Sequence, residues 1–155
     1  MVIARPDKYF LVAAYAEGPT PLNAFDNALM KAGIGNTNLI RISSILPPGA
    51  REISLPQLPY ASLIPTAYAE ETSDVVGQRI SAAVGCGVPE DPELPGVIME
   101  HHLIGDEASC RDAVLLRVKE AFAARGYRLE SVQVASASGV VERVGSVVAA
   151  VVLWS

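Results

Sequence analysis

The chain has 155 residues, half of them hydrophobic, and 17 acidic side chains against 12 lysines and arginines give a formal net charge of −5. This composition excludes a disordered polypeptide and a disulfide scaffold, because a chain of this length can bury a sizeable core without cross-links. The acidic balance argues against a nucleic-acid partner, and the scarcity of charge predicts apolar area between the subunits of an oligomer.

The chain is expected to begin with a strand and a helix. The continuous apolar run of residues 9–16 is typical of a strand covered on both faces. It is too short for a signal peptide or a membrane span, and so is the apolar C-terminus, so we expect a cytoplasmic protein without a membrane partner. Thr20 is placed to cap a helix that has Pro21 at its first position and ends at Gly33 and Gly35. The apolar stripe expected for this helix consists of Leu22, Phe25, Leu29 and Ala32.

Residues 38–43 return to strand character and end at the pair Ser43-Ser44, which a double proline soon follows. Serines favour strand ends because they bond to nearby main-chain groups, and the residues alone favour this local role for the pair. A proline-rich loop is expected over residues 47–65, and loops of this length are often functional.

The second half of the chain predicts four strands and one helix. Residues 79–88 and 96–105 are expected to form a hairpin around a polar turn, and residues 128–138 and 145–155 form two more strands. The helix between these pairs is expected to start at a capping pair and to end at a glycine. Its capping pair is Ser109 and Asp112, its core stripe is Leu115, Val118 and Phe122, and its terminal glycine is Gly126. The pattern indicates an α+β fold with largely antiparallel sheets.

Glutamate and histidine crowd together in residues 99–107 and raise the question of a metal site. In a strand, His101 and His102 point to opposite faces, so only Glu100 and His102 converge, which is too few ligands. We therefore expect no metal. Cys86 and Cys110 have no CxxC spacing and are expected to be buried free thiols.

Glu100 is a candidate general acid because it lies in an otherwise apolar strand, where burial would raise the pKa of its carboxyl. The alternative is a glutamate that faces solvent, and the residues alone favour that alternative. Asp26 lies on the first helix but off the apolar stripe, so it is expected on a solvated face.

Three segments carry a resemblance to a known family. Residues 24–49, with the string NLIRISSILPPG, together with residues 80–85 and 96–102, resemble the pyruvoyl-dependent arginine decarboxylases. The likeness extends over nearly the whole chain. It implies a single domain over residues 1–155, a four-layer αββα sandwich, and a homotrimer with active sites between subunits.

The resemblance also implies self-cleavage between Ser43 and Ser44, into a β chain of residues 1–43 and an α chain of residues 44–155. Ser44 would become a covalent pyruvoyl group that forms a Schiff base with the substrate, so pyridoxal phosphate is not needed. The implied reaction converts L-arginine to agmatine and CO2, a step toward polyamine biosynthesis or acid resistance.

In the same way the resemblance assigns roles to further residues. Glu100 matches the family's acid, Asn38 a catalytic position tied to the active site and to processing, and Asp26 the carboxylate that binds the guanidinium. The new carboxylate of Ser43 is a second candidate for substrate binding. A straight strand would put Asn38 about 20 Å from Ser44. Either the chain bends sharply or Asn38 serves a neighbouring subunit, and we favour the second. Two alternatives stay open: an unprocessed structural or regulatory subunit, and the same mechanism acting on another amino acid.

Overall fold

The computed structural model describes residues 4–155. The elements of this part of the chain are, in order, β1 (Lys8–Glu17), α1 (Pro21–Ala32), β2 (Asn38–Arg41), β3 (Ile45–Leu46), β4 (Arg51–Glu52), β5 (Leu63–Ser73), β6 (Arg79–Pro89), β7 (Gly96–Ile104), α2 (Glu107–Arg125), β8 (Leu129–Val140) and β9 (Gly145–Trp154).

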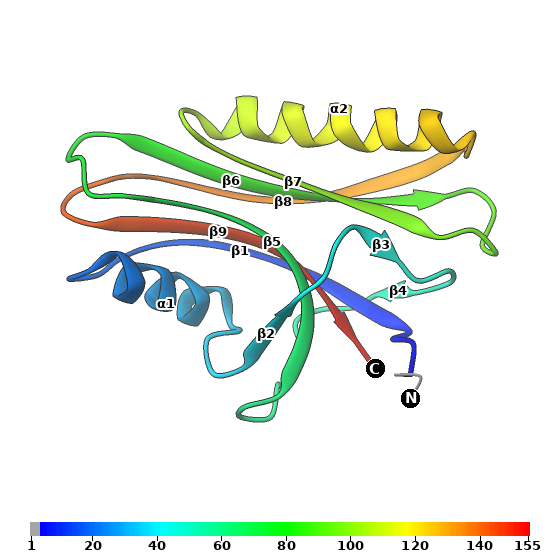
Figure 1. Cartoon of the computed structure of the whole chain (residues 1–155), viewed down its shortest axis with the longest axis horizontal. Helices are drawn as coiled ribbons and strands as arrows, with labels where there is room; N and C mark the ends of the chain where they lie inside the picture. Colours follow the sequence, from blue (N-terminus) through cyan, green and yellow to red (C-terminus); the bar gives the residue numbers. More distant parts are fainter. Residues whose placement is uncertain (1–3) are drawn as a thin grey trace.

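The strands form two sheets that pack face to face. The first sheet has the order β2-β5-β9-β1-β4 and the second the order β3-β7-β6-β8. Neighbouring strands run antiparallel except for the parallel pairs β1 with β4 and β2 with β5. Figure 1 shows α1 on the outer side of the first sheet and α2 on the outer side of the second. The expected α+β fold and its four αββα layers are therefore confirmed.

β9 illustrates how the first sheet is covered on both faces. Its residues are buried from Gly145 to Leu153, because one face meets the other sheet and the opposite face meets α1. Val147, Ala149 and Val151 join the core between the sheets, whereas the alternating Val148, Ala150 and Val152 join the core beneath α1. A strand covered on both faces requires a continuous apolar run, which the sequence supplies.

α1 begins and ends where the sequence predicts, but it packs through different residues. The Thr20 hydroxyl accepts a hydrogen bond from the Asn23 backbone N–H, and Gly33 takes the left-handed conformation at the C-cap. The buried residues are Ala24, Ala28 and Ala32, while Leu22 is 75% exposed, so its place in the expected stripe is wrong. Alanines let the helix approach the sheet closely, which leaves the larger side chains at the margins of the contact.

α2 starts earlier than the sequence analysis expected. The N-cap is Asp106, whose carboxylate accepts a hydrogen bond from the Ser109 backbone N–H, so the expected cap of Ser109 with Asp112 is wrong. Val118 and Phe122 are buried as predicted, and Gly126 ends the helix in the left-handed conformation. Within residues 4–155, neither helix combines the length and hydrophobicity that a membrane crossing requires.

The expected loop over residues 47–65 contains structure that the sequence analysis missed. It is interrupted by β4, and its end belongs to β5, which pairs along eight residues with β9. Pro65 obscured this strand, since proline lacks the N–H that a sheet ladder uses. It is tolerated here beside the short edge strand β2, where Pro65 lies opposite Ile40.

The chain crosses from the first sheet to the second between β2 and β3. β2 ends at Arg41, although the Ile42 N–H still donates to the Thr66 carbonyl at 3.1 Å. Beyond the crossing, the Ser44 carbonyl accepts from the Ile98 N–H of β7 at 2.7 Å, just before β3 pairs with β7. The bond between Ser43 and Ser44 therefore lies in a short connection that is held at both ends.

Candidate active site

The two serines of this connection line a cavity, here called the serine cavity, of about 370 Å³. Its lining residues are Ser43, Ser44, Ile98, Met99, Glu100 and Arg117. Ser44 is half-buried and Ser43 is exposed. The pairing of the connection with β7 fixes this arrangement, because β3 and the Ser44 carbonyl hold the serines beside the strand that carries Glu100.

The side chain of Glu100 is partly buried. Its side chain is 31% exposed, and burial raises the pKa of the carboxyl above its ordinary value, against the opposing effects of Arg41 and His102. This direction agrees with the expectation from its apolar strand, and it differs from a fully solvated glutamate. A raised pKa favours the protonated form that a general acid needs.

Arg41 is a neighbour of Glu100 that sequence reasoning missed. Its Nη2 lies 3.8 Å from Glu100 Oε1, and the same nitrogen donates to the Tyr68 carbonyl at 3.0 Å. The guanidinium also lies 4.3 Å from the centre of the Tyr68 ring, in a cation–π contact. β2 and β7 belong to different sheets and come together only because the two sheets pack face to face. No pattern within either segment could therefore have predicted this pair.

A second cavity, here called the edge cavity, opens beside the first and measures about 630 Å³. It is lined by Arg41, Tyr68, Ala69, Glu70, Glu100, His101, His102 and Arg117. Glu100 and Arg117 line both cavities. Glu100 therefore borders both the serine cavity and the edge cavity.

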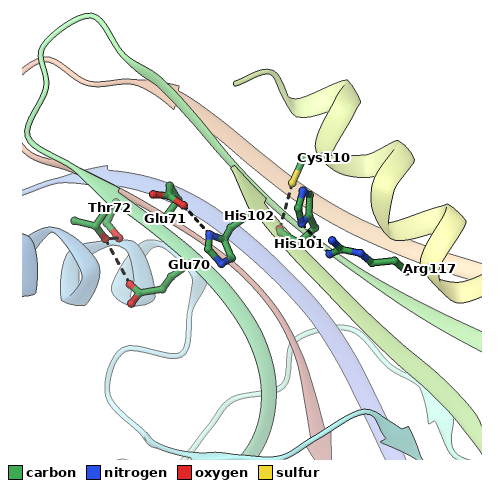
Figure 2. Close-up of polar contacts among 8 residues, drawn as sticks. Glu70, Glu71, Thr72, His101, His102, Cys110 and Arg117 are labelled. Carbon is green, nitrogen blue, oxygen red and sulfur yellow. Dashed lines mark hydrogen bonds and ion pairs between the residues drawn. The ribbon is translucent and has the colours of Figure 1, made fainter. Parts of the chain in front are cut away.

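His101 and His102 point in opposite directions, as expected for neighbours in a strand. His102 Nδ1 lies 2.6 Å from Glu71 Oε2 of β5, whereas His101 faces α2, where its carbonyl accepts from the Cys110 thiol (Figure 2). Within residues 4–155, no three histidine, cysteine or carboxylate side chains converge as a metal would require. Cys86 and Cys110 are buried free thiols, as predicted.

Arg117 reaches from α2 to the carbonyl of Glu100, a contact that sequence reasoning also missed. Its Nη1 donates to the Glu100 carbonyl at 2.8 Å. The same nitrogen donates to His101 Nδ1 at 2.8 Å (Figure 2). Burial lowers the pKa of His101, and the positive charge of Arg117 lowers it further. His101 is therefore neutral at neutral pH and offers Nδ1 as the acceptor.

The structure does not bring Asn38 or Asp26 into either cavity. Asn38 is exposed at the start of β2, where its Nδ2 donates to the Ala61 carbonyl at 3.3 Å. Asp26 is exposed on α1, in agreement with the solvated face that the sequence predicts. Within one chain, the candidate residues that meet are Ser43, Ser44 and Glu100.

This arrangement places a hydroxyl, a peptide carbonyl and a carboxyl of raised pKa around one hollow. The Ser44 hydroxyl is a potential nucleophile, and the Ser43 carbonyl belongs to the bond next to it. A pyruvoyl group derived from Ser44 fits this position, because it would replace a residue that already lines the serine cavity with Glu100. The carboxyl of Glu100 is thus suited to donate a proton to a group bound in the serine cavity.

Comparison with known proteins gives a consistent result over the whole chain. A family model described as pyruvoyl-dependent arginine decarboxylase matches residues 8–155. A protein of that name from Methanocaldococcus jannaschii is 46% identical over 149 residues, which cover 96% of this chain and 90% of the relative. The protein of the same name from Pyrococcus horikoshii is 43% identical over 157 residues, covering 99% of both chains.

Proposed function

The chain belongs to the pyruvoyl-dependent arginine decarboxylase family, and on this premise we propose that it is a cytoplasmic enzyme that converts L-arginine to agmatine and CO2. The observation that carries the proposal is the serine cavity, where Ser44 and Glu100 line one hollow. Family membership supports the carboxy-lyase activity, and the cavity supports the roles of the individual residues.

The first step is self-cleavage of the connection between the sheets. Ser44 Oγ attacks the carbonyl carbon of Ser43, the peptide C–N bond breaks, and the acyl group moves to oxygen as an ester. Elimination of the ester leaves a carboxylate on Ser43 and a dehydroalanine at position 44. The dehydroalanine tautomerises to an imine, and water hydrolyses this imine with release of ammonia. The products are residues 1–43 and residues 44–155, the latter beginning with a pyruvoyl group.

The pyruvoyl group supplies an electrophilic ketone for a Schiff base with the substrate α-amine and an electron sink for the carbon that loses CO2, without pyridoxal phosphate or a metal. Ile98 and Met99 give the serine cavity an apolar wall, which favours loss of a charged carboxylate as neutral CO2. Glu100 donates its proton to the α-carbon, and its burial raises the pKa of the carboxyl, which favours the protonated form.

Asn38 and Asp26 complete the site from a neighbouring subunit in a homotrimer. Both are exposed in the single chain and lie outside the two cavities, so a contribution within the same chain has no support. The 75% exposed Leu22 on α1, near Asp26, is a further apolar side chain that a neighbouring subunit would cover. Asp26 would then bind the substrate guanidinium in a charge-assisted pair.

The decisive experiment combines mass measurement with CO2 release on the purified protein. Wild type is expected to give two chains that meet at the bond between residues 43 and 44, and to release CO2 from L-arginine. Ser44→Ala is expected to stay intact and inactive, because alanine has neither the nucleophile nor the leaving group. Glu100→Gln keeps the Ser44 nucleophile, so it should still be cleaved, but it should lose turnover, which separates cleavage from catalysis. An intact wild-type chain that releases CO2 would refute the mechanism, and an intact inactive trimer would support a structural or regulatory subunit.

Substrate choice needs a separate experiment, because Asp26 reaches the site only through the neighbouring subunit. A site built for a guanidinium should reject lysine and ornithine, since its polar groups would be left unpaired. Asp26→Asn should raise the KM for arginine and reduce the ratio of kcat/KM for arginine to kcat/KM for lysine. Equal rates for the three amino acids in wild type would favour the same mechanism with another substrate.

A further inference from the structure

Arg117 is the one positively charged side chain among the described residues that line the serine cavity. The other lining side chains are two serines, two apolar residues and Glu100. Within residues 4–155, no carboxylate lies within 4 Å of the Arg117 guanidinium. Among the described residues, a positive charge that lines the same cavity as Ser44 therefore lacks a carboxylate partner.

The neutral partners of Arg117 hold it in place without neutralising its charge. Its Nη1 donates to a backbone carbonyl and to His101 Nδ1, and His101 is uncharged at neutral pH because burial lowers its pKa. A guanidinium has five N–H donors, and these two bonds involve only one of its three nitrogens. The remaining donors form a planar arrangement suited to a carboxylate.

Arg41 provides a contrast within the same region. It lies 3.8 Å from the Glu100 carboxylate, packs over the Tyr68 ring, and lines the edge cavity but not the serine cavity. The charge of Arg41 is thus already compensated, whereas Arg117 lines both cavities and has no carboxylate partner among residues 4–155.

We propose that Arg117 binds the α-carboxylate of the substrate amino acid. The inference rests on the proposed function, because that function attaches the substrate α-amine at position 44 and brings its α-carbon to Glu100. The carboxylate is bonded to that same α-carbon, so it must lie in the serine cavity, where Arg117 supplies the only positive charge of the described lining. This contact is made to the carboxylate of the bound substrate and weakens as CO2 leaves, so it contributes to substrate binding and gives no help to the chemical step. Loss of the carboxylate is favoured instead by the apolar wall of Ile98 and Met99.

The test compares a ligand that has the carboxylate with one that lacks it. The KM and kcat for L-arginine and the inhibition constant of agmatine are measured on cleaved wild type, Arg117→Met, Arg117→Lys and Arg125→Met. Arg125 is a matched control, because it lies on the same helix, donates from Nη1 to the Ala121 carbonyl at 3.0 Å, and lines neither cavity.

Arg117→Met should raise the KM for arginine by about tenfold or more, as loss of a charge-assisted hydrogen bond implies. Its kcat should not fall, because the lost contact stabilised only the bound substrate. Its inhibition constant for agmatine should stay within about twofold, since agmatine has no carboxylate. Arg117→Lys should show a smaller rise in KM, and it decides the question if the methionine variant fails to fold or cleave. Arg125→Met should match wild type.

Two results would overturn the inference while leaving the proposed function intact. One is an equal loss of affinity for arginine and agmatine, which would indicate a structural role of Arg117 around Glu100. The other is an unchanged KM, which would assign the guanidinium to the Ser43 carboxylate or to water. A wild-type protein that is intact and inactive would refute the proposed function first, and its mass would identify that case.

Discussion

Replacing Gly87 by alanine should force α2 away from the second sheet. A Cβ at this position would lie 2.6 Å from Val118 Cγ1 and 2.7 Å from Phe122 Cε2, both on the buried face of α2. Carbon atoms pack at about 3.5–4.0 Å, so about 1 Å of overlap must be relieved at two contacts. Overpacking of this kind costs about 1–3 kcal/mol of the free energy of unfolding, which corresponds to a fall in Tm of about 2–12 °C for this chain length.

A double-mutant cycle tests whether Val118 is the cause. Val118→Ala alone loses stability through a cavity, but it also removes the methyl that the new Cβ meets. The double variant of Gly87→Ala with Val118→Ala should therefore be more stable than the sum of the single effects by about 1 kcal/mol, measured by thermal and urea unfolding. Additive effects, or a Gly87→Ala protein as stable as wild type, would refute this account of how α2 packs against the second sheet.

Three further outcomes follow from the site and the helix ends. Arg41→Met should move the alkaline limb of the pH profile of kcat to higher pH. Burial raises the pKa of Glu100 and Arg41 lowers it, so without Arg41 the acid stays protonated to a higher pH. Thr20→Ala should lower Tm by about 2–4 °C through loss of about 1 kcal/mol of capping, whereas Thr20→Ser should restore most of it, as read by circular dichroism. Burial raises the pKa of Cys110 to about 11 and that of Cys86 to about 12, so a thiol reagent at pH 8 should label neither in the folded protein and both after unfolding; labelling before unfolding would contradict their burial.

The sequence predicts much of this fold because its strongest signals are local. Three kinds of signal each follow from contacts within a few residues: the apolar runs of the strands, the Thr20 cap, and the left-handed glycines Gly33 and Gly126. The errors arise where tertiary packing decides. The buried face of α1 is made of alanines because the sheet lies close, and β5 was missed because Pro65 resembles a breaker when its partner strand is unknown.

The candidate site divides along the same line. Glu100 and the serine pair could be singled out from their own segments, the first by its apolar strand and the second by its resemblance. Arg41 and Arg117 could not, because each reaches Glu100 from an element that is distant in the sequence. The contact of Arg41 depends on how the two sheets pack, and that of Arg117 on how α2 packs against the second sheet. No local pattern in the sequence encodes either.

The crossing at Ser43-Ser44 has a consequence for what a nick there would leave behind. Residues 1–43 contain β1, which pairs on one side with β9 and on the other with β4, both of which lie downstream of the nick. The shorter fragment would thus stay bound to the longer one through the sheet pairing of β1 and the packing of α1. Peptide-bond scission would release no piece of the molecule, and separating the two fragments would demand global unfolding.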